Sequence, residues 1–248
     1  MMTDSGFVQR WTRRSAGIAI LSASILGTGT FAAMGQVTSA PGTAKKRPKF
    51  NPPDYGSPKI RVTAATRGPG RDRVQYLGVL APEQVGHTMA ASPTLYWYLS
   101  QPFAGSVKVV LADDAQVEPV LELQLERGAP AGVHEVPLGE HRVVLKPGTE
   151  YQWSVTLVDD PDQPSGNPFA SGAIRRVAPV ALPKGADDAD RLVALAGQGL
   201  WYDAIELASR RIAARPKDAT WHAMRADLLE QQGLTVPAVH DRELAGTQ

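Results

Sequence analysis

Lys146-Pro-Gly-Thr-Glu-Tyr-Gln-Trp-Ser-Val-Thr-Leu-Val158 is the stretch of sequence that decides the fold. A Pro-Gly turn opens it, and apolar residues from Tyr151 to Leu157 then alternate with Gln, Ser and Thr. A half-buried strand has this period of two, because successive side chains point to opposite faces of a sheet. We therefore predict that residues 151–158 form a central strand of an antiparallel sheet, with Trp153 in its core.

Short apolar runs separated by turn residues predict seven further strands on either side of this one. They are residues 75–80, 94–99, 107–112, 120–126, 133–138, 142–145 and 171–177. Strands at regular intervals with no intervening helix favour an antiparallel β-sandwich of immunoglobulin or fibronectin type over residues 74–180. Only the architecture is predicted, since the two cysteines of an immunoglobulin domain are missing. Trp97 is expected to face Trp153 across this core.

Two places in the predicted sandwich offer candidate binding residues. Tyr96 and Tyr98 fall on the opposite face of their strand from Trp97, so one group must leave the core. We expect the tyrosines to face outward, where they could line a carbohydrate or peptide surface. Asp160 and Asp162 lie in an acidic loop, 159–167, whose oxygens could hold calcium. The loop lacks the ligand spacing of an EF-hand, so a solvated hairpin cap stays the alternative.

The last part of the chain carries helical patterns with caps and stops. Residues 187–198, 201–214 and 219–232 are predicted helices, and Trp201 begins the apolar face of the second. That helix resembles a tetratricopeptide repeat in the spacing of Ala204, Ala208 and Pro216, and the preceding Gly-Leu-Trp-Tyr-Asp is similar to the turn between the helices of a repeat.

Too few repeats are present for a free-standing solenoid, because each repeat needs neighbours to bury its faces. We therefore predict a three-helix cap at residues 186–235, packed on the sandwich, with a tail at residues 236–248. A peptide-binding groove in this unit is the alternative.

The beginning of the chain is typical of an export signal. Three arginines precede a nearly uncharged run from residue 15 to 40, and small residues follow near Ala32. Residues 1–35 are predicted to be a signal peptide, cleaved after Gly35 or Ala40; an uncleaved membrane anchor is the alternative. We expect a bacterial protein located in the periplasm or outside the cell. Residues 36–73, rich in Pro, Gly and basic residues, are predicted to be a disordered linker.

The composition of the chain excludes several kinds of binding and catalysis. The formal net charge of +1 over 248 residues provides no basic field for nucleic acid, and the absence of cysteine excludes thiol catalysis, cysteine zinc sites and disulfides. The five histidines lack the spacings of metal ligands, and Ser165 is not in a nucleophile elbow. We predict no catalytic residues, no metal and no cofactor.

A wider resemblance covers roughly residues 67–235. It consists of an ordered series of motifs: Arg67-Gly-x-Gly-Arg71, Leu77 to Pro82, Ser92-Pro-Thr-Leu-Tyr-Trp-Tyr98, Leu145-Lys-Pro-Gly-x-x-Tyr-x-Trp153, Asp160-Pro-Asp162, Gly172-x-Ile-x-Arg-Val177 and Gly199-Leu-Trp-Tyr-Asp-Ala204. This series resembles the bacterial domain of unknown function DUF928. The resemblance implies an exported bacterial protein without an established activity, and it transfers no catalytic residues.

These observations favour a non-enzymatic extracytoplasmic module that binds protein or assists a sensor, with another envelope protein as its partner. The alternative is an envelope-associated domain, structural or carbohydrate-binding, that uses Tyr96 and Tyr98. An enzyme is the third possibility. Contact with a membrane is expected only through an uncleaved signal.

Overall fold

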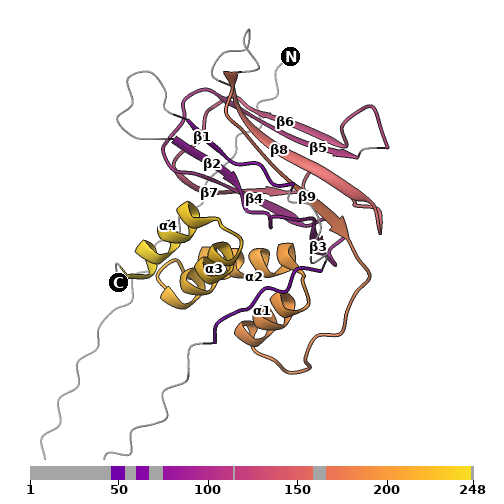
Figure 1. Cartoon of the computed structure of the whole chain (residues 1–248), viewed down its shortest axis with the longest axis vertical. Coiled ribbons are helices and arrows are strands. Elements are labelled where there is room, and N and C mark those ends of the chain that lie inside the picture. Colours follow the sequence, from indigo (N-terminus) through magenta and orange to yellow (C-terminus); the bar gives the residue numbers. More distant parts are fainter. Residues whose placement is uncertain (1–45, 54–59, 67–74, 114, 159–165, 247–248) are drawn as a thin grey trace, which may run out of the picture. The chain divides into compact units, whose positions relative to one another are not determined.

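The computed structural model describes residues 46–53, 60–66, 75–113, 115–158 and 166–246. The predicted signal peptide therefore lies outside the described residues. Within them the fold is mainly β with α, as predicted: nine strands precede four helices (Figure 1). The strands are β1 Ala64–Thr66, β2 Gln75–Val79, β3 Gly86–Thr88, β4 Thr94–Leu99, β5 Ser106–Asp113, β6 Leu121–Leu125, β7 Gly132–Pro137, β8 Glu150–Val158 and β9 Phe169–Arg176. The helices are α1 Asp188–Gly197, α2 Trp201–Ala214, α3 Ala219–Gln231 and α4 Thr235–Gly246.

The strands form two sheets, and β8 lies in the middle of the larger one. The five-stranded sheet has the order β3-β9-β8-β5-β6, and the four-stranded sheet has the order β1-β2-β4-β7. All pairs are antiparallel except β3 with β9. Side chains of β8 alternate between buried and half-buried along its whole length. The strand predicted from alternation at residues 151–158 is thus confirmed.

The two sheets lie close together at Gly172 of β9. A Cβ atom at this position would lie 2.5 Å from Cβ of Ala81 and 3.3 Å from Cγ2 of Val79, which is too close for any larger residue. Trp97 of β4 and Trp153 of β8 are both buried. Trp97 stacks on His134 of β7, with ring centroids 4.1 Å apart.

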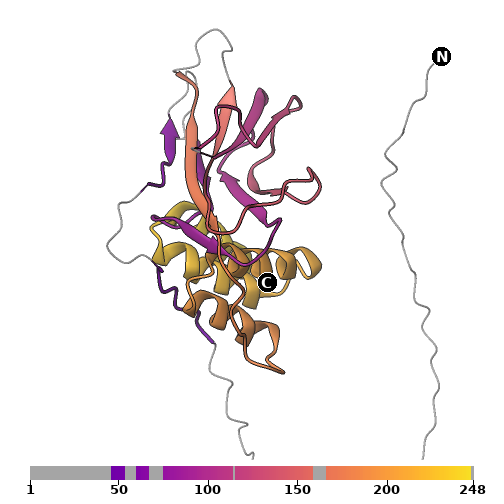
Figure 2. The same cartoon turned by 90° about the vertical axis from the view of Figure 1, so that its right-hand side faces the viewer.

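Helix α2 joins the helical part of the chain to the sheets through buried hydrogen bonds. The Trp201 indole N–H donates to the carbonyl oxygen of Leu80 at 2.8 Å. The next residue, Tyr202, accepts from the Trp153 indole N–H at 2.8 Å and donates to the carbonyl oxygen of Ala173 at 3.0 Å. Gly86 permits this approach, since a Cβ there would lie 2.5 Å from the Tyr202 ring. In both views the helices gather on one side of the two sheets (Figures 1 and 2).

The secondary structure differs from the prediction in three places. The predicted strand at 142–145 is wrong, because residues 138–143 close into tight turns and Arg142 has a left-handed φ of 59°. Strands β1 and β3, of three residues each, were too short to leave an alternating pattern. Most of the predicted tail at 236–248 is helix α4, which adds a fourth helix to the predicted three.

The prediction of a disordered linker over residues 36–73 is wrong for its described parts. Phe50 is buried, and its ring meets Trp201 edge-on with centroids 4.8 Å apart. Its backbone N–H donates to Gln231 of α3, and the Asn51 N–H donates to Ala196 of α1. Strand β1 pairs with β2. One large aromatic side chain is enough to hold a short polar segment, because its burial offsets part of the entropy of ordering the chain.

Substitution of Tyr202 by Phe should destabilise the protein, because it leaves the buried indole N–H of Trp153 without its acceptor and removes one hydrogen bond to the buried carbonyl of Ala173. We expect a loss of about 2–3 kcal/mol in the free energy of unfolding, measured by denaturant titration. Tyr151→Phe is the matched control, since the Tyr151 hydroxyl accepts one bond from the backbone of exposed Lys146, which water can replace. Equal losses in the two variants would contradict this prediction.

Candidate functional site

The tyrosines predicted to face outward are buried. Tyr96 is 4% exposed and Tyr98 is 5% exposed, because helices cover the second face of β4. Glu206 of α2 accepts from the Thr94 N–H at the start of the strand, and the Tyr98 ring lies 5.3 Å from that of His240 in α4. Burial raises the pKa of Tyr96 to about 12. The prediction of an aromatic surface at Tyr96 and Tyr98 is therefore wrong.

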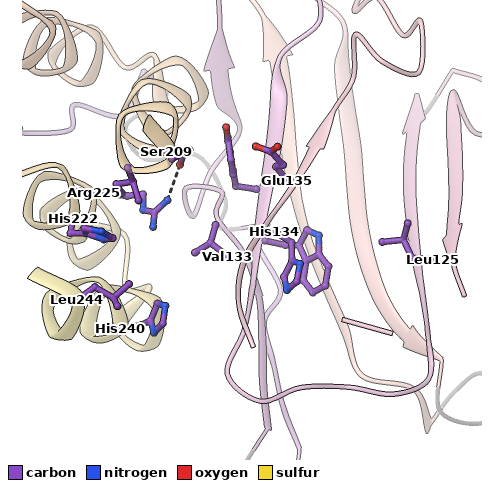
Figure 3. Close-up of a pocket in the computed structure, with 13 residues that line it drawn as sticks. Leu125, Val133, His134, Glu135, Ser209, His222, Arg225, His240 and Leu244 are labelled. Carbon is purple, nitrogen blue, oxygen red and sulfur yellow. Dashed lines mark hydrogen bonds between the residues drawn. The ribbon is translucent and has the colours of Figure 1, made fainter. Parts of the chain in front are cut away.

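A recess lies between the helices and the edge strand β7. It is a cleft of about 570 Å³ (Figure 3). Its lining combines apolar, aromatic and ionisable side chains from both sheets and from α2, α3 and α4: Tyr96, Trp97, Leu125, Val133, His134, Glu135, Ser209, Ile212, Ala213, His222, Arg225, His240 and Leu244.

Strand β7 passes through the cleft and divides its lining in two. Val133 lies on the side of the helices, whereas His134 lies on the side of β6, as alternation along a strand requires (Figure 3). Burial lowers the pKa of His134, whose Nε2 lies 2.8 Å from the carbonyl oxygen of Pro130. The ring it stacks on, Trp97, has a buried Nε1 with no hydrogen-bond partner among the described residues.

A buried charged network forms the helical wall of the cleft. Arg225 of α3 binds Asp241 of α4 in a bidentate pair, with both N···O distances at 2.7 Å, and donates to Ser209 of α2 at 2.9 Å. His222 places Nδ1 3.3 Å from the same carboxylate and Nε2 3.0 Å from the carbonyl oxygen of Pro216. Three helices thus meet at one guanidinium group.

The electrostatics of this network favour the ionised state of Asp241. Burial by itself would raise the pKa of the carboxyl group, but hydrogen bonds and charge from Arg225, followed by His222, outweigh it and hold the pKa below its ordinary value. A bidentate Arg–carboxylate pair also fixes the relative orientation of the helices that carry it. The network therefore gives the cleft a rigid wall.

A second buried carboxylate anchors the loop that leads into β4. Asp203, in the first turn of α2, accepts from the Met89 N–H at 3.1 Å. Burial raises the pKa of this carboxyl group to about 6. Asp203 holds residues 88–90 against the helix, and its protonation state changes near neutral pH.

The cleft contains only part of what was predicted from the sequence. Tyr96 and Trp97 line it, while Trp153 and Trp201 are buried elsewhere, and Asp160 and Asp162 lie outside the described residues. The calcium hypothesis for their loop stays a prediction. Among the residues described, no group of three or more His, Asp or Glu is placed to hold a metal ion. None of the described helices combines the length and apolarity needed to cross a membrane.

The sequence-based predictions did not include the buried pair of Arg225 and Asp241. Arg225 stands one helical turn after Trp221 and one before Leu229, so it interrupts an apolar stripe, and an arginine at such a position is a sign of a buried partner. Asp241 gave no comparable signal, because its helix carries exposed valines and leucine beside its charges.

A family model described as Domain of Unknown Function (DUF928) matches residues 62–242. A search of curated proteins finds no match to the chain.

Replacement of Asp203 by Asn should change how stability depends on pH. The folded-state pKa is raised above the unfolded value of 3.8, so the native state binds more protons and stability falls as the pH rises from about 4 to 7. The shift corresponds to a loss on the order of 2–3 kcal/mol over this window. The free energy of unfolding should therefore fall less with pH in Asp203→Asn than in the wild type; parallel pH profiles would refute the assignment.

Removal of one partner of the buried Arg225–Asp241 pair should lower the free energy of unfolding more than removal of both partners. Arg225→Met leaves an uncompensated carboxylate and should lower the free energy of unfolding by about 3–5 kcal/mol. The double variant Arg225→Met with Asp241→Leu should recover a large part of that loss, because no buried charge remains. Chemical denaturation of the single and double variants measures the difference, and a double variant as unstable as the single one would contradict it.

Proposed function

The chain belongs to the DUF928 family, and from this premise we propose that it is a non-enzymatic extracytoplasmic module that binds another protein or assists a sensor. The premise supplies no activity, since the function of the family is undefined. Support for the proposed function comes from the chemistry of the cleft beside β7.

The observation that carries the proposal is the mixed lining of this cleft. Ile212 and Ala213 of α2 and Leu244 of α4 offer apolar contact, and the aromatic ring of Trp97 borders the same space. Recesses with apolar walls and a few polar groups are typical of binding sites. Leu244 is 40% exposed, an apolar residue that a partner could cover.

The roles of the perturbed carboxylates also support binding rather than catalysis. Asp203 accepts from a backbone N–H, and Asp241 is held by Arg225, so each is engaged in the structure of the helical unit. A general acid or base must reach its substrate's proton. The Asp241 side chain has no exposed surface.

The same proposal includes the finer architecture. The two mostly antiparallel sheets are consistent with a sandwich of immunoglobulin or fibronectin type, and the helical hairpins of α1 to α4 are consistent with a unit similar to tetratricopeptide repeats. Both architectures commonly serve recognition. The basic and apolar beginning of the chain supports export to the periplasm or the cell exterior, where another envelope protein would be the partner.

The carbohydrate-binding alternative loses its main support. It required Tyr96 and Tyr98 at the surface, where their rings could stack on sugars, and both are buried under helices. We therefore carry forward only protein binding.

Charge placed in the cleft should abolish partner binding. Ile212→Glu puts a carboxylate on the apolar wall, whereas Val144→Glu makes a similar change at a residue that is 63% exposed and does not line the cleft. After cross-linking in the envelope fraction of a bacterium that encodes the chain, a partner retained by the wild type and Val144→Glu should be lost by Ile212→Glu. We expect at least about tenfold weaker affinity for Ile212→Glu with the purified partner.

Two outcomes would contradict the proposal. One is that Ile212→Glu, folded as judged by its thermal transition, keeps every partner of the wild type. The other is turnover of a hydrolase substrate that a single carboxylate substitution abolishes.

A further inference from the structure

Strand β7 is an edge strand, and one side of its backbone faces the cleft. In the sheet order β1-β2-β4-β7 it pairs only with β4. The Leu138 N–H donates to the carbonyl oxygen of Pro93 at 3.1 Å, just beyond the end of the paired strands. Hydrogen-bonded pairs alternate along an antiparallel ladder, so this bond fixes which residues of β7 point toward β4.

In this alternation, the backbone N–H and C=O groups of the odd-numbered residues of β7 do not pair with β4. His134 and Val136 direct their backbone groups to β4, whereas Val133 and Glu135 direct theirs to the outer edge. Among the described residues, no hydrogen bond joins these outward N–H and C=O groups to another element. Pro137 follows and has no N–H to offer. The edge of β7 therefore presents two free peptide donors and their carbonyl acceptors.

The surroundings of the β7 edge differ from those of most edge strands, which are protected against pairing with other chains. Exposed edges are commonly defended by charges, prolines or covering loops, because they can pair with other chains. Here the edge carries Glu135 and Pro137, but it lies in a recess with apolar residues on both sides. Leu244 lies on the helical side, and Leu125, 42% exposed, lies on the side of β6 (Figure 3). Ile212 of α2 lines the same recess.

The walls decide which kind of chain can reach the edge. A second copy of this protein would have to bring its own β7 edge out of an identical recess. We expect the helices and β6 of the two copies to meet before the two edges do, because they flank the β7 edge in each copy. A single extended segment, which carries its pairing groups on a narrow backbone, meets no such obstacle.

We infer that this cleft binds an extended segment of the partner protein, which adds to the four-stranded sheet as a fifth strand beside β7. The inference rests on the proposed protein-binding function and specifies how that binding occurs. Backbone hydrogen bonds to Val133 and Glu135 hold the segment, and its side chains alternate between the helical wall and the β6 wall.

The walls also set the sequence that the segment should carry. Side chains at every second position meet Ile212, Ala213 and Leu244, so they should be apolar. Those in between lie toward Leu125 and the ring of His134, where aliphatic or aromatic residues fit. Recognition by strand addition thus predicts an apolar segment without internal proline, since each proline removes a backbone donor.

A peptide probe and backbone amide exchange test the inference on the mature chain. The probe is selected from a random displayed peptide library against the wild type, with Ile212→Glu used to remove peptides that bind elsewhere. Addition of the peptide should slow exchange at the Val133 and Glu135 amides by at least about tenfold, as expected for new backbone hydrogen bonds. Amides of His134 and Val136 should be protected with or without peptide. Peptide binding that leaves Val133 and Glu135 unprotected would overturn the inference.

N-methylation of the peptide backbone provides a test that does not alter the protein. Methyl groups at alternate positions should weaken binding by at least about tenfold, and those between them should be tolerated, because only every second N–H of a strand faces its neighbour. Tolerance at every position, or a helical period of three to four, would refute strand addition.

Glu135→Pro and Glu135→Ala form a matched pair of variants. Proline removes the outward N–H and leaves the ladder to β4 intact, whereas alanine removes only the side chain. Binding of the peptide should be lost in Glu135→Pro and kept in Glu135→Ala, with both variants checked by their thermal transitions. If Glu135→Pro does not fold, the N-methyl series decides.

The outcomes separate this inference from the function on which it rests. A protein partner that is lost in Ile212→Glu but retained in folded Glu135→Pro would leave protein binding in place and refute strand addition. A protein partner that still binds both Ile212→Glu and Glu135→Pro would refute strand addition and the proposed binding function together.

Discussion

The structure depends most on one buried hydroxyl group. Tyr202 is the second residue of α2, and its hydroxyl accepts from Trp153 of β8 while donating to the Ala173 carbonyl of β9. Both partners lie in the interior, where a lost hydrogen bond is not replaced by water, so the helix has little freedom to shift. Gly86 allows the ring to come close enough. The far end of α2, at Ile212 and Ala213, lines the cleft beside β7.

The remaining helices are positioned by charge rather than by apolar packing alone. Arg225 reaches Ser209 in α2 and Asp241 in α4 from its place in α3. A buried ion pair adds little net stability compared with apolar residues, but a mispaired charge is costly, so such a pair selects one arrangement over others. This selection fixes how α2, α3 and α4 lie relative to one another.

Local sequence patterns predicted the structure correctly where one face of an element meets water. They predicted it incorrectly where both faces are covered. Alternation in β8 predicted its span because its second face is only half-buried. The same rule applied to β4 misplaced Tyr96 and Tyr98, because it could not reveal that helices cover the second face. Phe50 illustrates a similar failure, since its polar neighbours predicted disorder while Trp201, distant in sequence, supplied the contact.

The sequence by itself determined the family, the mainly β composition with a helical end, the central strand and the ends of three helices, because these depend on periodicity, turns and caps that act within a few residues. Only the tertiary structure decided the order of strands, the burial of the tyrosines, the Arg225–Asp241 pair and the recessed edge of β7. Each of these joins residues far apart in the chain, and their burial depends on what covers them. A local pattern carries no information about the covering element.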